Sequence, residues 1–244
     1  MTSEEQNKVA MVIVAHPDDA EFGSAGTSAL WVKEGWDVYY VICTDASGGG
    51  DDLATSLSVA ARRATTETRK REQRAAGEII GLKEIIFLDY PDGLLEPSLA
   101  LRRDLVRMLR TYRPSRVICP SPDRVWNPVY SIGRHHPDHL ACGQAALAAV
   151  YPASQNAWDF PELLAEGLTP HKVSEVYVVG APVNNYSVDI SSTLDTKIEA
   201  LRAHDSQLGS HFDEVEKWMR EGAARAGEAD GLPFAERFHR IENN

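Results

Sequence analysis

The 244-residue sequence contains only three cysteines, and their spacing matches neither a disulfide pair nor a zinc knuckle. Cys43 and Cys119 each end an apolar run, and Cys142 lies far from both in the sequence. We therefore expect buried, reduced thiols, as is usual for a cytoplasmic protein.

Long hydrophobic segments are also missing. No apolar run approaches the roughly 20 residues that are needed to span a bilayer. Residues 1–8 are polar and partly acidic. They lack the basic start and the apolar stretch of a secretion signal. The sequence therefore predicts a soluble, intracellular protein without a membrane span.

Positive charge is in deficit, with 25 Lys and Arg residues against 36 Asp and Glu residues and a formal net charge of -11. Phosphate backbones are bound by clustered Lys and Arg side chains, so nucleic acid is not expected as a partner. The same balance says little about a small neutral substrate. Hydrophobic residues make up 43% of the chain, which is ordinary for a globular protein.

The order of predicted elements indicates the fold class. Buried strands are expected at Val9–Ala15, Asp37–Cys43, Glu84–Leu88, Ser115–Cys119 and Ser174–Val179. Helices are expected at Ser24–Glu34, Ala61–Ile80, Leu99–Tyr112, Ala141–Val150, Thr193–His204 and Asp213–Ala226. Strands that alternate with helices predict parallel βαβ units. No low-complexity linker divides the chain, so we expect one α/β domain over residues 1–244, with a Rossmann-like, doubly wound, mostly parallel sheet and helices on both faces.

The predicted topology brings two distant polar clusters together. In doubly wound sheets the strand order reverses beside the first strand, which pairs with the fourth, and ligands bind outside the carboxyl ends of these strands. One histidine-aspartate cluster, residues 16–19, directly follows the first strand, and another, residues 135–139, follows the fourth after a loop. We therefore expect His16 and His139 to lie close together.

The first cluster reads His16-Pro17-Asp18-Asp19. The strand holds the backbone of His16, and Asp19 is close enough for both side chains to turn toward one ion. One of the two adjacent carboxylates can bind a metal while the other acts as a general base. Alternatively, the cluster is the N-cap of a helix. Gly23 and Gly26 do not form a GxGxxG turn, so dinucleotide binding has little support here.

The second cluster contains His136 and His139 on either side of Pro137-Asp138. One imidazole could complete a ligand set with His16 and Asp19 and leave positions for water and substrate. The other, oriented by Asp138, could stabilise an oxyanion or protonate a leaving amine. The alternative is again a capped helix start with exposed histidines.

Both clusters match signature motifs of a known family. Ala15-His-Pro-Asp-Asp19 and His136-Pro-Asp-His139 resemble the two motifs of the LmbE/PIG-L family of metal-dependent de-N-acetylases. Weaker similarities are Arg69-Lys-Arg-Glu72, Leu88-Asp-Tyr-Pro-Asp-Gly93 and the segment from Lys197 to Gln207. The similarity extends over most of the chain.

The resemblance implies roles for six residues. It makes His16, Asp19 and His139 ligands of a zinc ion, for which another divalent transition metal could substitute. It makes Asp18 the general base, His136 the electrostatic or acid partner, and Asp138 the carboxylate that orients His136. The implied activity is hydrolysis of an N-acetyl group on an amino sugar or its glycoconjugate.

Three further residues are expected to bind substrate. The resemblance associates Arg69 and Asp92 with sugar hydroxyls, and Arg134 lies in the loop where selectivity is set. Alternatively, Arg69 pairs with Glu72 on a helix face, and Asp92-Gly93 forms a turn. Family analogy also suggests a homo-oligomer.

Two other classes of function stay open at the level of sequence. The first is a metal-free Rossmann-type enzyme that binds a nucleotide sugar or a dinucleotide. The second is a non-catalytic binding protein on the same fold. The chain also departs from many family members, which have Glu directly after the second aspartate, whereas here Ala20 intervenes before Glu21.

Overall fold

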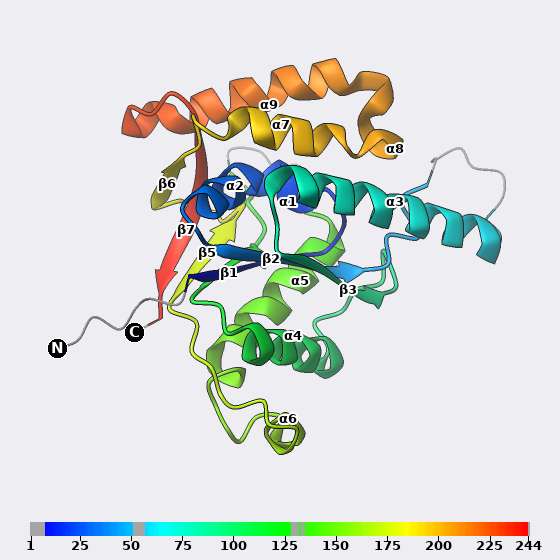
Figure 1. Ribbon diagram of the computed structural model, residues 1–244, viewed down its shortest axis with the longest axis vertical. Helices are drawn as coiled ribbons and strands as arrows, with labels where there is room; N and C mark the ends of the chain where they lie inside the picture. Colours follow the sequence, from blue (N-terminus) through cyan, green and yellow to red (C-terminus); the bar gives the residue numbers. More distant parts are fainter. Residues whose placement is uncertain (1–7, 51–56, 128–131, 133–134, 244) are drawn as a thin grey trace.

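A seven-stranded sheet forms the centre of the computed structural model, which describes residues 8–50, 57–127, 132 and 135–243 (Figure 1). The strand order is β3-β2-β1-β4-β5-β7-β6. The strands are β1 (Val9–Val14), β2 (Asp37–Thr44), β3 (Glu84–Tyr90), β4 (Arg116–Pro120), β5 (Glu175–Val179), β6 (Tyr186–Asp189) and β7 (Ala235–Glu242).

The sheet has the predicted switch point. Strand β1 pairs in parallel with β2 on one side and with β4 on the other. Strands β3 and β5 extend the parallel part outward from β2 and β4. The chain therefore reverses its strand order beside β1, which confirms the doubly wound α/β fold, and the ends of β1 and β4 lie next to each other.

Two antiparallel strands at the β5 edge were not predicted from the sequence. Strand β7 pairs antiparallel with β5 and with β6. Its sequence, AERFHRIE, is half charged and lacks an apolar run. Glu236 is nevertheless buried, because it pairs with Lys197 at 2.5 Å and accepts the backbone N–H groups of Gly26 and Thr27.

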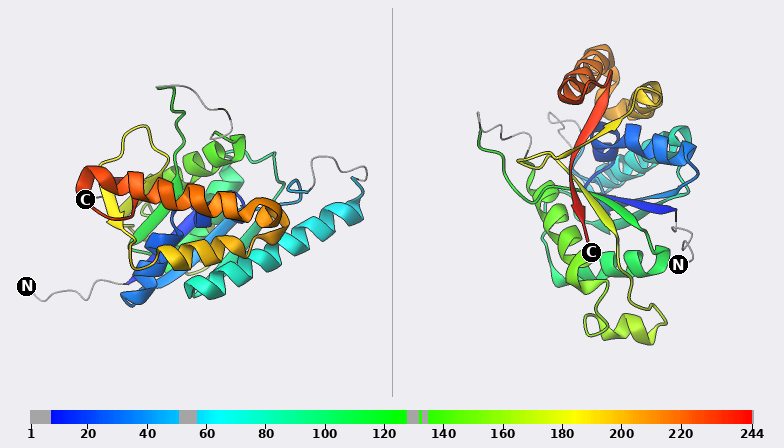
Figure 2. Two further views of the ribbon diagram at one scale, coloured as in Figure 1. Left: turned by 90° about the horizontal axis from the view of Figure 1, so that it is seen from above. Right: turned by 90° about the vertical axis from the view of Figure 1, so that its left-hand side faces the viewer.

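Helices cover both faces of the sheet, as expected (Figures 1 and 2). One face carries α1 (Asp19–Gly23), α2 (Ala25–Lys33) and α3 (Val59–Ile80), and the other carries α4 (Leu99–Tyr112) and α5 (Pro137–Ala148). Outside α1–α3 lie α7 (Leu194–Arg202), α8 (Asp205–Leu208) and α9 (Phe212–Gly227). The short α6 (Pro161–Ala165) lies beyond α4. Among the described helices, none is both long and apolar enough to cross a membrane.

Strand β1 is buried on both faces, which is why its sequence is continuously apolar. Met11 and Ile13 pack into the core beneath α4 and α5, whereas Ala10 and Val12 pack into the core beneath α2 and α3. A third cluster of apolar side chains joins α7 to α9. Alternation along β1 thus directs successive side chains to opposite layers.

Helix α5 begins four residues earlier than predicted, at Pro137 instead of Ala141. Proline is favoured in the first turn of a helix because its backbone angle is already helical and its missing N–H is not needed there. His136 is the N-cap. The second histidine cluster therefore lies at the start of α5 and not in a preceding loop.

The segment from Tyr151 to His171, for which the sequence suggests no function, is organised by a buried arginine. Arg110 of α4 is only 2% exposed. Its guanidinium donates hydrogen bonds to the backbone oxygens of Ala153, Ser154, Asn156 and Asp159. The segment is therefore anchored beneath the sheet by one side chain.

Candidate active site

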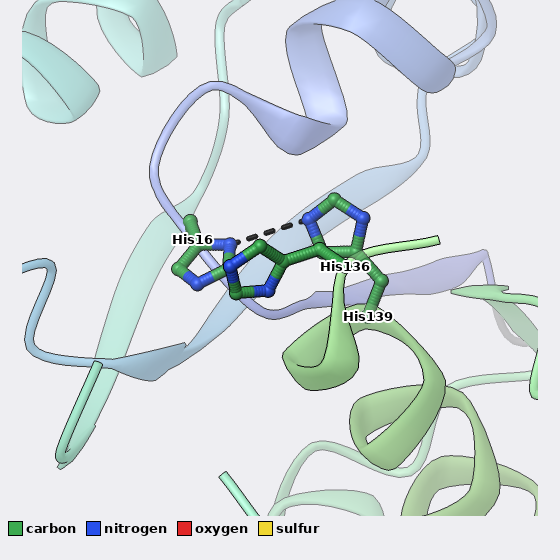
Figure 3. Close-up of side chains that lie close together, drawn as sticks. All are labelled: His16, His136 and His139. Atoms are coloured by element: carbon green, nitrogen blue, oxygen red, sulfur yellow. Dashed lines mark hydrogen bonds between the residues drawn. The ribbon is translucent and has the colours of Figure 1, made fainter. Parts of the chain in front are cut away.

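The two histidine clusters meet at the carboxyl ends of β1 and β4. His16 follows β1, and its Nδ1 lies 3.3 Å from Nε2 of His139 on α5 (Figure 3). The backbone N–H of His16 donates to Oδ2 of Asp19 at 2.8 Å. The proximity of His16 and His139 that the topology predicts is thus confirmed.

Three side chains in this cluster, those of His16, Asp19 and His139, have the spacing of ligands around one ion. His139 Nε2 lies 3.0 Å from Asp19 Oδ1, and His16 Nδ1 lies 3.5 Å from Asp19 Oδ2. With bonds of 2.0–2.1 Å, two ligands of a tetrahedral zinc ion are roughly 3.3 Å apart. The separations in this cluster fall on either side of that value, so the donor set fits a zinc-sized dication.

The other nitrogen of His16 faces two carboxylates. Nε2 lies 3.0 Å from Asp92 Oδ1 and 3.2 Å from Asp138 Oδ2. A metal-binding histidine typically donates its second N–H to a carboxylate, which directs the free lone pair at the ion. Burial lowers the pKa of His16, but hydrogen bonds to Asp138, Asp19 and Asp92 outweigh it and raise that pKa to about 12. The carboxylates around this imidazole therefore favour a cation next to it, either a second ring proton or a metal ion on Nδ1.

The carboxylate of Asp138 orients His16, which corrects the prediction that it orients His136. Asp138 is fully buried. In addition to its hydrogen bond with His16, the Asp138 carboxylate accepts the backbone N–H groups of Gly93 at 2.7 Å and Leu95 at 3.2 Å. Gly93 and Leu95 lie in the loop that follows β3, so this loop holds the Asp138 carboxylate in place. Asp138 therefore lies behind a proposed metal ligand.

His136 is oriented by backbone. Its Nδ1 accepts the N–H of Asp138 at 3.2 Å, so the helix-cap alternative is correct for this residue. Burial and the neighbouring His16 lower the pKa of His136. In the neutral ring the proton must then reside on Nε2, which makes that atom a hydrogen-bond donor. The rings of His136 and His16 meet edge to face, 4.9 Å apart (Figure 3).

Asp18 has an unusual backbone conformation. Its φ is 84°, in the left-handed region that non-glycine residues rarely adopt. Its side chain makes no capping bond to α1, so the helix-cap alternative is wrong here. Instead Oδ2 accepts a hydrogen bond from Arg69 at 2.9 Å. Burial raises the pKa of Asp18 to about 6, against the opposing effect of Arg69.

Arg69 lies within the site and does not pair with Glu72. Its guanidinium is buried and also donates to the carbonyl oxygen of Pro17 at 2.8 Å. Asp92 accepts the backbone N–H of Gly48 at 2.9 Å. A polar cavity of about 320 Å³ is lined by His16, Asp18, Gly48, Gly49, Arg69, Asp92, Gly93 and His136.

A buried network beneath Asp18 was not identified from the sequence. Gln73 accepts the backbone N–H of Asp18 at 3.0 Å and donates to Glu21 at 2.8 Å. Glu21 in turn lies 3.5 Å from the ring of His204, and both are fully buried. The available signal was that Gln73 follows Arg69 by one helical turn and so shares its face of α3. This network explains Glu21 as a structural support of the left-handed turn.

Of the other residues singled out in the sequence, Arg134 lies outside the described residues. His135 accepts the backbone N–H of Val125 at 3.2 Å. Gln207 donates to the carbonyl oxygen of Gly49 at 2.9 Å, which connects α8 to a lining residue of the polar cavity. Ser206 donates through its backbone and side chain to Glu72.

Comparison with known proteins identifies relatives over almost the whole chain. The family described as PIG-L, GlcNAc-PI de-N-acetylase, matches residues 11–150. Diacetylchitobiose deacetylase of Thermococcus kodakarensis is 34% identical over 230 residues, which cover 94% of this chain and 81% of that protein. A probable N-acetyl-alpha-D-glucosaminyl L-malate deacetylase 2 of Bacillus anthracis is 27% identical over 221 residues and covers 89% of each chain.

A solved structure shows the same fold. The N,N'-diacetylchitobiose deacetylase from Pyrococcus horikoshii, complexed with its inhibitor MPG, aligns with a TM-score of 0.85 at 30% identity. The alignment covers 96% of this chain and 84% of that chain. The family match includes both histidine clusters, at residues 16–19 and 135–139.

Proposed function

Because the chain belongs to the PIG-L family, we propose that it is a deacetylase of N-acetylated amino sugars or their conjugates and that its chemistry depends on a divalent metal. One observation carries the metal dependence. His16 Nδ1, His139 Nε2 and the Asp19 carboxylate, from segments more than a hundred residues apart, are spaced like the ligands of a single ion. The relatives named for diacetylchitobiose and N-acetylglucosaminyl malate support the substrate class.

The metal would be held by His16, Asp19 and His139, with His16 oriented by Asp138 and Asp92. Imidazole and carboxylate ligands suit zinc, and also iron(II) and cobalt(II). We propose zinc because the donor atoms are about as far apart as two ligands of a tetrahedral zinc ion. When bound, such an ion supplies Lewis acidity, which lowers the pKa of water and polarises an amide carbonyl.

Asp18 is the proposed general base. Its pKa, raised to about 6 by burial, leaves the carboxylate ionised at neutral pH yet basic enough to take a proton from an attacking water. The hydrogen bond from Arg69 holds Oδ2 in place, and Gln73 holds the backbone. The same carboxyl group then carries the proton to the departing amine nitrogen.

His136 is proposed to stabilise the oxygen of the amide as negative charge develops there. Its Nε2–H can donate because its Nδ1 is occupied by the start of α5. A donor held in advance costs no reorganisation when the charge appears, which is the basis of oxyanion stabilisation. Arg69 and Asp92, in the wall of the polar cavity, are proposed to bind sugar hydroxyls.

The test is acetate release from a panel of N-acetylated amino sugars, including N-acetylglucosamine and diacetylchitobiose, by protein whose metal content is measured by elemental analysis. We expect stoichiometric zinc and release of acetate from at least one member of the panel. Fully zinc-loaded protein that releases acetate from none of them would contradict the proposal. Thermal stabilisation by NAD without bound metal would instead favour the dinucleotide-binding alternative.

A further inference from the structure

A second cavity, of about 430 Å³, adjoins the proposed metal ligands and is distinct from the polar cavity. Its wall includes Asp19 and His139 themselves. Most of the remaining wall is apolar and comes from β1, α1, β4, α5, β5 and α9, through Val14, Phe22, Ile118, Leu140, Val179 and Trp218. The two cavities share none of their lining residues, and each includes part of the proposed ligand set: His16 lines the polar cavity, whereas Asp19 and His139 line the apolar one.

The two serine hydroxyls in this wall already have hydrogen-bond partners. Ser24 Oγ donates to the carbonyl oxygen of Ala20, and Ser121 Oγ accepts the backbone N–H of Asp123 at 3.0 Å. Burial raises the pKa of the Cys119 thiol to about 12, so this side chain stays neutral and behaves as a small apolar group. The cavity therefore offers a mainly apolar surface to a ligand; its other polar lining residues are the exposed Asp123 and His135, whose Nε2 accepts the backbone N–H of Val125.

We propose that this apolar cavity binds the acyl group of the substrate, so that the enzyme also hydrolyses N-acyl amino sugars whose acyl chain is longer than acetyl. The inference rests on the proposed function of the site. In the reaction, the oxygen of water bonds to the carbonyl carbon and the carbon–nitrogen bond breaks. Both protons of the water pass to the amine nitrogen, which leaves as an ammonium group, and the acyl chain leaves as a carboxylate.

Connectivity favours an acyl chain over other occupants. The first acyl carbon is bonded directly to the carbonyl carbon, so the chain must begin next to the metal ligands, where this cavity begins. An apolar group attached to another position of the sugar would begin further from the metal ligands, by up to the width of the sugar ring. The polar groups Arg69 and Asp92, which suit sugar hydroxyls, line the polar cavity.

The cavity is also larger than the volume that the methyl group of an acetyl group would fill. If a methylene-sized group takes about 30 Å³, the share of liquid volume that a water molecule has, an eight-carbon chain needs about 240 Å³. The cavity of about 430 Å³ accommodates such a chain with room for solvent at its mouth. Each methylene removed from water contributes to affinity, since the wall is apolar.

The first experiment measures binding without turnover. Chelator-treated, metal-free protein is titrated calorimetrically with N-acetyl-, N-butanoyl-, N-hexanoyl- and N-octanoylglucosamine. We expect the Kd to fall about two- to fourfold for each added methylene up to hexanoyl. Equal Kd values along the series, or no measurable binding of the hexanoyl and octanoyl members, would overturn the proposal.

A pair of matched variants locates the effect. Val179→Phe fills the cavity from the end of β5, whereas Val183→Phe makes the same change at an exposed position four residues further along. We expect Val179→Phe to abolish the dependence of Kd on chain length and Val183→Phe to retain it. If both variants keep the dependence, the chain binds elsewhere and the proposal is wrong.

Kinetics with zinc-loaded enzyme separates this inference from the proposed function. We expect kcat/KM to rise from acetyl to hexanoyl in the parent enzyme and in Val183→Phe, and the hexanoyl-to-acetyl ratio to fall at least tenfold in Val179→Phe. Acetate release with steadily falling activity on longer chains would overturn the acyl cavity and keep the deacetylase. Chain-dependent binding without any hydrolysis would support the cavity and contradict the proposed enzyme.

Discussion

Both ring nitrogens of His16 have close partners, but one faces the other proposed ligands and the other faces two carboxylates. Nδ1 faces Asp19 and His139, whereas Nε2 faces the carboxylates of Asp92 and Asp138. The carboxylates favour the tautomer that leaves the lone pair on Nδ1. The ring therefore connects the negative charge of Asp92, in the loop after β3, and of Asp138, in the first turn of α5, to the proposed metal position.

The first prediction at the residue scale concerns the base. Asp18→Asn keeps the size of the side chain and removes its ability to accept a proton. We expect kcat for deacetylation to fall about 10²- to 10⁴-fold while metal content stays at the parent level. Stopped assays of acetate release and elemental analysis on the same sample provide the two measurements. Full activity in this variant would show that another group takes the proton.

A second prediction concerns the residue behind the ligand. Asp138→Asn removes the charge that orients His16 but no proposed ligand. We expect zinc affinity to fall about 10- to 100-fold, the usual cost of losing such a partner, as measured by competition with a fluorescent chelator. Asp104→Asn, which alters the remote partner of the Tyr90 hydroxyl, serves as the control. Unchanged affinity in Asp138→Asn would mean that Asp92 suffices.

Among the elements, α5 places three site residues within its N-cap and first turn. Its N-cap His136, its first-turn Asp138 and its next residue His139 each face a different partner. The missing backbone donor of Pro137 and the capping bond fix where the helix starts. A shift of the start by one residue would rotate these side chains by about 100° and separate them from β1.

The anchoring of residues 151–171 by Arg110 leads to a stability prediction. Arg110→Ala leaves two buried and two partly buried carbonyl groups without their donor. We expect a loss of about 3 kcal/mol in the free energy of unfolding, and hence a Tm lower by about 6–12 °C. Arg107→Ala, on the same helix but paired with the exposed Glu166, should cost less than about 1 kcal/mol. Thermal melts followed by circular dichroism compare the two variants, and equal losses would refute the anchoring role.

The contact between α1 and the segment after α7 predicts a pH dependence of stability. Burial lowers the pKa of His204, but Glu21 outweighs it and the pKa is raised, with Asp18 and Arg69 also facing the ring. The folded protein therefore binds this proton more tightly than the unfolded chain, whose histidine has a pKa of about 6.5. The stabilisation is complete below that value and is lost as the pH rises through the folded-state pKa.

The measurement is urea unfolding of the parent protein and of His204→Gln at several pH values from 6 to 9. We expect the difference in free energy of unfolding to be largest at the lowest pH and to shrink as the pH rises. Taking the difference removes the titration of other groups from the comparison. A difference that is constant over this range would show that His204 is neutral in the folded protein.

At the scale of the whole molecule, the sheet's switch point determines where charge accumulates. The ends of β1 and β4 and the loop after β3 bring Asp19, Asp92 and Asp138 around one imidazole. Three carboxylates at such distances repel one another unless a cation lies among them. Folding and cation binding are therefore expected to be coupled.

This coupling can be tested by removing and restoring the metal. We expect zinc to raise the Tm of chelator-treated protein, with a gain of about 2.7 kcal/mol in the free energy of unfolding at 100 times the Kd. His139→Ala should lose this response, whereas His211→Ala, at an exposed histidine on the molecular surface, should keep it. A zinc-induced shift of the same size in both variants would refute the proposed ligand set.

The elements that the sequence predicted well are those whose environment is uniform. Strand β1 lies between two layers of helices, so its sequence is apolar throughout and its limits differ by one residue from the prediction. Strand β7 escaped prediction because its buried Glu236 depends on Lys197, Gly26 and Thr27 from other elements. Such burial of charge has no local signal in the sequence.

By itself, the sequence determined which side chains stand at the end of β1, because the first motif follows that strand directly, and which side chains follow β4 after a loop. It also determined that the ends of these two strands meet, since a doubly wound sheet leaves few alternatives. The tertiary structure alone decided that Asp138 faces His16, that Gln73 and Glu21 support Asp18, and that an apolar cavity adjoins the ligands. These features depend on distances between segments that are separated by tens to more than a hundred residues, and only the packing of helices on the sheet sets such distances.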